Sequence, residues 1–272
     1  MNRDLAIVAS AGGMTCAYSV GGVLALKDLG ITTPQWAIGS SGSTGTLAYM
    51  TSGQYQCFRN IWEKLLTVRE FISFIRVRPI IDIDYLIDQV FKIQDPLDVL
   101  AIRKSPTELL MATTNCETGR VRYFSSREEN IDIFEALRAS KAMPFVYGKK
   151  VLLDGQLYFD GALVGSVWRN IMEAIRKGAK QIIVLDNNTH VHGWQAWDKV
   201  FARTLPKNVS DSMRSAANNP KNIRYPGIKI IHVTPWRSLP AKLLDNNSQR
   251  IRATIDIGYE DVMNCKEIKE LT

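Results

Sequence analysis

The chain has 272 residues, of which 46% are hydrophobic, and it carries a formal net charge of +7 at pH 7. This length and hydrophobic content can bury a large core, and because no linker rich in Pro, Gly or Ser divides the chain, we expect a single domain over residues 1–272. The sequence has no repeat or low-complexity tract, which excludes solenoids and disordered tails, and no apolar run approaches the roughly 20 residues that span a bilayer.

The first predicted unit is a strand over Asp4–Ala9 that leads through a glycine-rich turn into a helix over Ala17–Leu29. In such a unit the backbone N–H groups point at one place and can hold an anion, either a phosphate or the oxyanion of an acyl-transfer reaction. We predict that Gly12, Gly13 and Met14 supply these N–H donors. A nucleotide site is excluded because the turn lacks both Gly-x-Gly-x-x-Gly and the lysine of a phosphate loop.

The second unit is a strand over Gln35–Ile38 that runs into a segment of small residues, Gly39-Ser40-Ser41-Gly42-Ser43. Small residues suit a sharp strand-to-helix turn that pushes one serine hydroxyl into a cleft, the arrangement called a nucleophile elbow. We predict that Ser41 is the nucleophile and that the N–H of Gly42 is a further oxyanion donor. Ser43 is a rival nucleophile, but it lacks the glycine two positions earlier that such elbows have.

A carboxylate follows a later strand. The predicted strand Leu157–Phe159 leads directly into Asp160, with the flexible Gly161 behind it. A serine nucleophile needs a base to remove its proton, and Asp160 is the candidate for that role. The nearby Asp154 precedes Gly155 in a two-residue turn pattern, so we interpret it as a structural residue.

Short apolar strands alternate with helical segments along the chain, which predicts an α/β sheet covered on both faces. Strands are predicted at Asp4–Ala9, Gln35–Ile38, Glu108–Thr114, Val121–Phe124, Lys150–Leu153, Leu157–Phe159, Gln181–Asp186 and Ile228–Val233. Helices are predicted at Ala17–Leu29, Gly42–Thr51, Gln56–Leu66, Asp84–Val90, Asp132–Ala139, Val167–Lys177 and Ser248–Glu267. For Phe71–Pro79 two interpretations stay open, an interfacial lid over an acyl pocket and an ordinary helix packed on the core.

These motifs, in this order, resemble those of the patatin-like phospholipases. The matching segments are Ala11–Gly13, Ser41, Ala139–Pro144, Tyr158–Ala162 and Gly258–Asp261. The resemblance implies a three-layer α/β/α fold with a mainly parallel central sheet, and a lipid acyl hydrolase that uses a serine-aspartate dyad, here Ser41 and Asp160, through an acyl-enzyme. It implies phospholipid or other lipid ester substrates, no metal and no cofactor.

The chain departs from the family's pattern at small positions around the site. The family has glycine where this chain has Ala11, and Arg or Lys followed by Gly where this chain has Thr15 and Cys16. Ser43 and Ala162 replace two further glycines. These departures keep a second hypothesis open, a catalytically silent relative that binds membranes or proteins.

A third hypothesis is an α/β-hydrolase triad, because Ser41, Asp160 and then His232 follow that fold's order. His190 and His192 have a spacing that could suggest a metal, but a third ligand is missing from the pattern, so we expect a structural role and no metal. The four cysteines are scattered without a Cys-x-x-Cys pair, which favours a reducing compartment and a cytoplasmic location.

Positive charge is concentrated in residues 199–229, which hold seven Lys or Arg against one acidic residue, Asp211. Such a segment is attracted to anionic lipid surfaces, by about 1 kcal/mol per charge. We therefore consider peripheral membrane contact through residues 199–229, with a solvated loop as the equal alternative. Nucleic acid is not expected as a partner, since the segment has no aromatic interleaving and no groove-binding motif.

Overall fold

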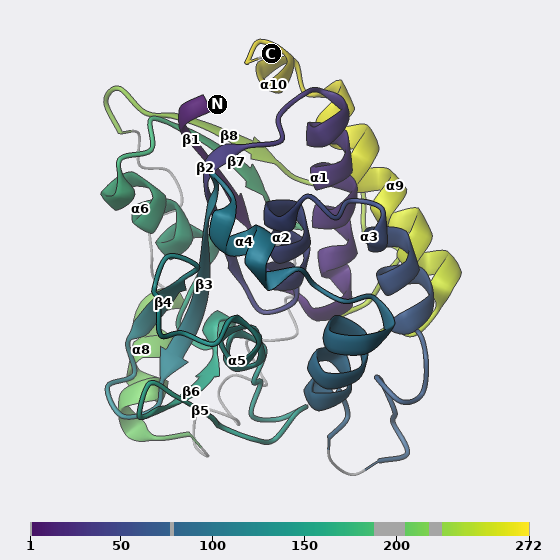
Figure 1. Cartoon of the computed structure of the whole chain (residues 1–272), viewed down its shortest axis with the longest axis vertical. Helices are drawn as coiled ribbons and strands as arrows, with labels where there is room; N and C mark the ends of the chain where they lie inside the picture. Colours follow the sequence, from purple (N-terminus) through teal and green to yellow (C-terminus); the bar gives the residue numbers. More distant parts are fainter. Residues whose placement is uncertain (1, 77–78, 188–204, 218–224, 272) are drawn as a thin grey trace.

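The computed structural model describes residues 2–76, 79–187, 205–217 and 225–271, and its centre is one twisted sheet (Figure 1). The strands follow the order β5-β6-β3-β2-β1-β7-β8, with β4 paired to β3 outside this path. Their bounds are β1 Asn2–Ala9, β2 Pro34–Ser40, β3 Glu108–Asn115, β4 Val121–Ser125, β5 Val151–Leu153, β6 Gln156–Asp160, β7 Gln181–Leu185 and β8 Lys229–Val233.

The sheet is mixed and mostly parallel. The pairs β1–β2, β1–β7, β2–β3 and β7–β8 are parallel, whereas β3–β4, β3–β6 and β5–β6 are antiparallel. The turn predicted at Asp154 and Gly155 is confirmed, since it joins the antiparallel strands β5 and β6. The strands β2 and β6 flank β3 and run in opposite directions. Ser40 at the end of β2 pairs with Ala112, and Asp160 at the end of β6 pairs with Thr113, so the two strand ends meet at adjacent residues of β3.

Helices cover both faces of the sheet, so the fold is the expected α/β/α arrangement of three layers (Figure 1). In β1, Leu5, Ile7 and Ala9 belong to the core on one face, whereas Ala6 and Val8 belong to the core on the other. A strand that is buried on both faces in this way is typical of parallel sheets between helices. The helix α6, Val167–Lys177, covers one face, and α1, Ala17–Asp28, lies on the other with α2, Gly42–Ser52, and α9, Ser248–Asn264.

The helices α1 and α9 pack backbone to backbone through two glycines. A Cβ atom on Gly21 would lie 1.8 Å from the carbonyl oxygen of Ile255, and one on Gly258 would lie 2.0 Å from that of Tyr18. The hydroxyl of Tyr18 also donates a hydrogen bond to Asp261 at 2.8 Å. The motif Gly258–Asp261 therefore fastens the last long helix to the helix that follows the glycine-rich turn.

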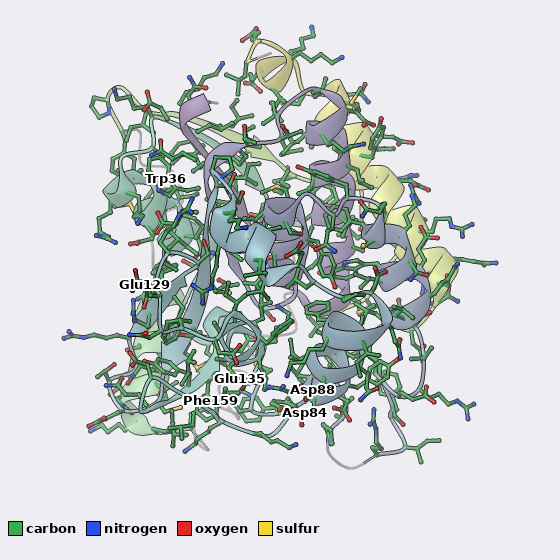
Figure 2. All side chains as sticks on the ribbon, in the orientation of Figure 1. Trp36, Asp84, Asp88, Glu129, Glu135 and Phe159 are labelled. Atoms are coloured by element: carbon green, nitrogen blue, oxygen red, sulfur yellow. The ribbon has the colours of Figure 1, made fainter. Side chains whose placement is uncertain are left out.

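A buried arginine fixes α5, Ile133–Ser140, against the π-helix η3, Tyr85–Gln94. The guanidinium of Arg138 bonds Asp84, Asp88 and Glu135, and these carboxylates lie close together in Figure 2. Two or more charge-assisted hydrogen bonds to one planar guanidinium fix its orientation. This contact holds the C-terminal end of α5 in one place, beside the predicted nucleophile.

The remaining short elements show where the sequence expectations were wrong. The expected helix over residues 56–66 is α3, Cys57–Asn60, followed by the π-helix η2, Ile61–Leu65, and the last helix breaks at Cys265 before α10, Lys266–Lys269. Residues 71–76 form turns and an isolated bridge between Ile72 and Ile81, not a helix. Four elements were not expected: α4 Val99–Lys104, α8 Lys207–Ala217, and the 3₁₀ turns η1 Gly13–Cys16 and η4 Gly161–Leu163. Within the described part of the chain, no helix has the length and apolar character needed to cross a membrane.

Candidate active site

Ser41 occupies a sharp turn between β2 and α2. Its backbone has φ 57° and ψ −130°, a region that non-glycine residues rarely adopt and that costs on the order of 1–3 kcal/mol. Gly42, the first residue of α2, has no space for a side chain: a Cβ atom there would lie 2.8 Å from the carbonyl oxygen of Gly13 and 3.0 Å from Sγ of Cys16. The turn is thus held in a strained form by its close packing against the glycine-rich loop.

Ser43, the rival nucleophile, is fully buried behind this turn. Its hydroxyl lies within hydrogen-bond distance of the carbonyl oxygens of Ser40, at 2.9 Å, and Ala9, at 3.2 Å, and it accepts the N–H of Ser40. These bonds tie the end of β2 to β1. Ser43 therefore has a structural position and faces no cavity.

The structure brings Ser41 and Asp160 together across 119 positions of sequence. The hydroxyl of Ser41 donates a hydrogen bond of 2.7 Å to Oδ2 of Asp160. The other carboxylate oxygen accepts the N–H of Ala162 at 2.8 Å, which fixes the orientation of the group at the start of η4. A nucleophile and a base within hydrogen-bond reach, with the base oriented by a third group, are the geometric requirements of nucleophilic catalysis.

The Asp160 carboxyl is 1% exposed, and burial raises its pKa to about 6. The N–H of Ala162, the hydroxyl of Ser41 and the charge of Lys141 act in the opposite direction and favour the carboxylate. A base is most effective when its pKa lies near the working pH, because it is then ionised and still able to hold a proton. The pKa of Asp160 meets that requirement at neutral pH.

The segment that follows α5 contacts both members of the pair. The N–H of Ser41 donates to the carbonyl oxygen of Ser140 at 3.1 Å, and the N–H of Asp160 donates to that of Ala142 at 3.0 Å. Residues 140–142 therefore hold the main chains of Ser41 and Asp160 in place. This is a physical reason for the presence of small residues in Ala139–Pro144, because both bonds need the backbone to approach closely.

The glycine-rich loop lies beside Ser41, and one of its predicted donors needs correction. The N–H of Met14 donates to the carbonyl oxygen of Leu243 at 3.0 Å and is not available to an oxyanion. The contact is close because Gly13 has φ 54° and a Cβ atom there would lie 2.4 Å from the same oxygen. Within the described residues, the N–H groups of Gly12, Gly13 and Gly42 have no hydrogen-bond partner. These three remain the candidates for the oxyanion site.

Thr15 and Cys16, at two of the positions where the chain departs from the expected pattern, pack against the glycine-rich loop. The hydroxyl of Thr15 donates to the carbonyl oxygen of Gly12 at 2.7 Å, and the side-chain amide of Asn187 donates to Thr15 at 3.2 Å. The Cys16 thiol is fully buried, and burial raises its pKa to about 12, so it stays neutral. The replacements preserve a packed, hydrogen-bonded loop but place no charge in it.

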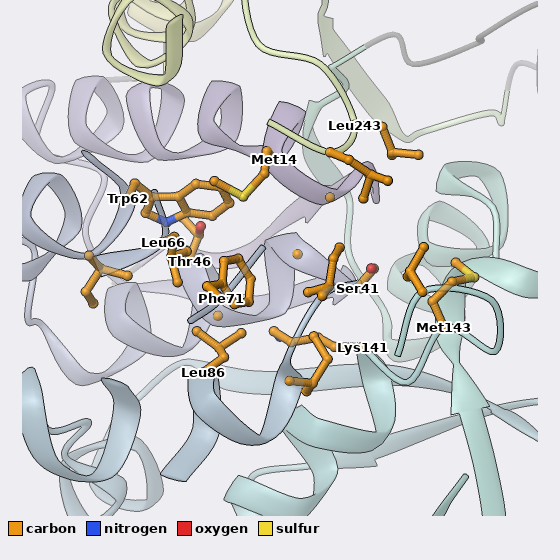
Figure 3. A pocket seen from close by; sticks show the side chains of 18 of the residues that line it. Met14, Ser41, Thr46, Trp62, Leu66, Phe71, Leu86, Lys141, Met143 and Leu243 are labelled. Carbon is orange, nitrogen blue, oxygen red and sulfur yellow. The ribbon is translucent and has the colours of Figure 1, made fainter. Parts of the chain in front are cut away.

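A cavity begins at this pair (Figure 3). It leaves about 90 Å³ for the centres of water-sized molecules, and about 870 Å³ of empty space when the open solvent at its mouth is included. Ser41 lies between Lys141 and Leu243, and the aromatic and aliphatic side chains of Trp62, Leu66, Phe71 and Leu86 lie on one side of it (Figure 3). Of the described residues that line the cavity, only Lys141 and Asp160 are charged. Such a lining is suited to a long apolar group that ends at Ser41.

Lys141 belongs to this site, although the sequence analysis did not predict a role for it beyond its place in the segment Ala139–Pro144. It is 5% exposed, and its ammonium group donates a hydrogen bond to the hydroxyl of Thr44 on α2. Lysine is seldom buried without a carboxylate, and a lysine in the middle of the small and apolar segment Ala139–Pro144 was the available signal.

The other predicted residues lie apart from the pair. His232 is an exposed residue of β8, three strands away from β2 in the sheet, and it does not line the cavity. Asp154 has φ 50° in the turn between β5 and β6, as its structural interpretation expected.

His190 and His192 lie outside the described residues, as do residues 199–204 and 218–224 of the basic segment. Within the part of the chain that the structure describes, no three His, Cys, Asp or Glu side chains are grouped to hold a metal ion.

Comparisons with known proteins bear on the family and the fold of the chain. A family model described as "Patatin-like phospholipase" matches residues 7–171, a range that holds Ser41 and Asp160. The chain is 27% identical over 154 residues to the uncharacterized protein YjjU of Escherichia coli (strain K12), covering 54% of this chain and 42% of YjjU. It therefore spans less than half the length of this relative. The crystal structure of VipD from Legionella pneumophila has the same fold, with a TM-score of 0.59 at 12% identity, over 99% of this chain and 67% of that one.

Proposed function

The chain belongs to the patatin-like phospholipase family, and from this premise we propose that it is a serine-dependent lipid acyl hydrolase with Ser41 as nucleophile and Asp160 as base. The observation that carries the proposal is the 2.7 Å contact between the Ser41 hydroxyl and the Asp160 carboxylate at the end of an apolar cavity. No histidine lies at this cavity among the described residues, so the proposal needs only the two side chains.

In the first half of the reaction, Oγ of Ser41 attacks the carbonyl carbon of an ester while its proton passes to Oδ2 of Asp160. The carbonyl oxygen becomes an oxyanion, and the proposed donors to it are the N–H groups of Gly12, Gly13 and Gly42. The tetrahedral intermediate then breaks its bond to the alcohol oxygen, which takes the proton back from Asp160. The products of this half are the free alcohol and an acyl group on Ser41.

In the second half, a water molecule gives its proton to Asp160 and its oxygen attacks the acyl carbon. The bond to Oγ of Ser41 breaks, Ser41 recovers the proton from Asp160, and the carboxylic acid leaves. Each half needs Asp160 to be ionised at the start. A pKa of about 6 makes the carboxylate the main form at pH 7.

The cavity supports the proposed substrate class. The lining side chains are almost all aliphatic or aromatic, and they include Phe58, Trp62 and Phe91 from three different elements. This surface supports a fatty acyl chain as the group that enters, hence phospholipid or other lipid esters as substrates. Peripheral contact with a membrane through residues 199–229 remains part of the proposal, as does a cytoplasmic location, which the four free cysteines support.

We also propose that the hydrolase unit extends over the whole chain as one domain, beyond the matched residues 7–171. Residues after 171 supply β7 and β8 at one edge of the sheet, and Leu243 bonds the glycine-rich loop. The helix α9 packs on α1 through Gly21 and Gly258. Without these segments the glycine-rich loop, which is proposed to bind the oxyanion, would lose the contacts that hold it in place.

The test is fatty-acid release from phospholipid vesicles by the wild type, Ser41→Ala and Ser52→Ala. Ser52 lies on the same helix and bonds only local groups, so its variant is the matched control for loss of a serine hydroxyl. We expect release by the wild type and Ser52→Ala and none by Ser41→Ala. Vesicle binding without release in all three proteins would contradict the proposal and favour the silent relative.

A further inference from the structure

Lys141 is a buried cation at the edge of the proposed active site. Its side chain lines the cavity and passes over Gly45 of α2, where Cε of Lys141 would lie 3.8 Å from an added Cβ atom. The absence of a side chain at Gly45 leaves room for Lys141. Figure 3 shows Lys141 next to Ser41 at the same end of the cavity. A buried ammonium group is costly unless its charge has a use or a partner.

The ammonium group is linked to the nucleophile through one residue. Lys141 donates to the hydroxyl of Thr44, and that hydroxyl donates to the carbonyl oxygen of Ser41 at 2.7 Å. Among the described residues, Thr44 is the side-chain partner of Lys141. Lys141 is therefore held at the turn without a carboxylate in direct contact, and its charge acts on its surroundings through space.

The charged groups that act on Lys141 are few. Burial lowers its pKa to about 7, and the Asp160 carboxylate opposes this change by favouring the ammonium form. The Cys16 thiol of η1 is neutral at these pH values because its own pKa lies at about 12. The carboxylates of η3, Asp84 and Asp88, are engaged by Arg138. Lys141 and Asp160 are the two charged side chains among the described residues that line the cavity, and Thr44 and Ser41 join them by hydrogen bonds. This shared, mostly apolar surrounding makes Asp160 the electrostatic partner of Lys141, and Lys141 in turn lowers the pKa of Asp160.

We propose that Lys141 is a positioning residue that acts through Asp160. The ammonium group of Lys141 keeps the buried Asp160 carboxyl ionised, so that this carboxylate can accept the proton of Ser41. This inference rests on the proposed function. Near pH 6, where Asp160 titrates, Lys141 is mostly in its ammonium form. The proton that moves in the reaction passes from Ser41 to Asp160 and on to the leaving alcohol.

The first test is the pH dependence of kcat/KM on a soluble ester for the wild type and Lys141→Met. Without the ammonium group the pKa of Asp160 rises, by about one unit or more for a lost opposite charge nearby. We expect the acid limb of the profile to move to higher pH by that amount, and the two profiles to converge at alkaline pH, where Asp160 is ionised in both proteins. A loss by the same factor at every pH would mean a merely structural role and would overturn the proposal.

Two further variants separate charge from shape. Lys141→Arg keeps a permanent cation, and we expect it to restore the acid limb to its wild-type position. Lys64→Met removes one positive charge from an exposed residue of η2 and is the control for net charge, with no expected shift. An acid limb that stays displaced in Lys141→Arg, or that moves equally in Lys64→Met, would contradict the proposal.

A second test does not need activity. The carboxyl carbon of Asp160, assigned by comparison with Asp160→Asn, is titrated by 13C NMR in the wild type and in Lys141→Met. We expect a higher pKa in the variant, and an unchanged pKa would overturn the inference even if both proteins hydrolyse esters. If the wild type hydrolyses no ester, the proposed function fails, whereas this titration still decides whether the two charges are coupled. Should Lys141→Met not fold, Lys141→Gln serves the same comparison.

Discussion

Ser140 accepts the main-chain N–H of Ser41 twice over, with its carbonyl oxygen at 3.1 Å and its hydroxyl at 3.3 Å. Two residues later the carbonyl oxygen of Ala142 accepts the N–H of Asp160. The end of α5 and the residues after it therefore hold the main chains of both Ser41 and Asp160. Arg138, two residues before Ser140, holds this end of α5 against η3.

We expect Asp160→Asn to remove most of the activity without loss of fold. The asparagine side chain can still accept the N–H of Ala162 but cannot take a proton from Ser41. General bases contribute about 10²–10⁴-fold, so kcat should fall within that range. The measurement is kcat on a soluble ester, with circular dichroism of both proteins as the control for folding. Activity within a few-fold of the wild type would show that Asp160 is not the base.

The same substitution should remove a loss of stability that the wild type undergoes as the pH rises. The pKa of Asp160 rises from 3.8 to about 6 on folding, so between these values the folded state binds more protons than the unfolded state. Stability is therefore lost as the pH rises through about 6, and Asp160→Asn is free of that loss, a difference on the order of 1–3 kcal/mol.

Denaturant unfolding of both proteins at about pH 5 and about pH 7.5 measures this difference. We expect the free energy of unfolding of Asp160→Asn, relative to that of the wild type, to be larger at the higher pH. A relative free energy that is equal at both pH values, or larger at the lower one, would contradict the assigned pKa.

Gly21→Ala should destabilise the protein far more than Gly22→Ala, its neighbour on α1. The new Cβ atom at position 21 would lie 1.8 Å from a backbone oxygen of α9, whereas at position 22 it would lie 2.8 Å from the movable end of the Leu185 side chain. Overpacking against backbone costs about 1–3 kcal/mol or more, because two helices must separate. Thermal unfolding of the two variants gives the comparison, and equal melting temperatures would count against the close contact of α1 and α9.

Thr46→Val should raise stability and leave the dyad intact. The hydroxyl of Thr46 lies buried in the cavity wall and has no hydrogen-bond partner among the described residues, and valine has nearly the same shape. An unsatisfied buried hydroxyl costs about 1–3 kcal/mol, so a gain of about 1 kcal/mol in the free energy of unfolding is expected. Denaturant unfolding measures it, with Thr51→Val as the control, because the Thr51 hydroxyl bonds the carbonyl oxygen of Leu47 and its loss should not stabilise.

Much of the fold was readable from the sequence because local patterns and tertiary contacts agree. The strand that ends before Ser41 and the one that leads into Asp160 are short, apolar and bounded by glycine, and both occur at the predicted positions within two residues. Gly161 follows Asp160 because a Cβ atom there would lie 2.2 Å from the carbonyl oxygen of Ala112 on β3. The order of these motifs therefore reflects close backbone contacts between elements far apart in the chain.

Other features depend on partners that no local pattern names. The N–H of Met14 is bonded by Leu243, which lies 229 positions later in a segment without a motif. Lys141 gains its significance from Thr44 and Asp160, which only the folded chain brings near it. The sequence of residues 71–76 allows both a lid and a helix, and their conformation is set by contacts far along the chain, since Ile72 pairs with Ile81 and Phe71 lines the cavity.

The central claim is that Ser41 is activated by Asp160, and covalent labelling by a fluorophosphonate probe tests it most directly. The wild type and Asp160→Asn are treated with the probe, digested, and the modified peptide is mapped by mass spectrometry. We expect one modified residue in the wild type, Ser41, and little or no modification in Asp160→Asn. Labelling at another serine, or labelling of Ser41 that is equally fast without the carboxylate, would contradict the account.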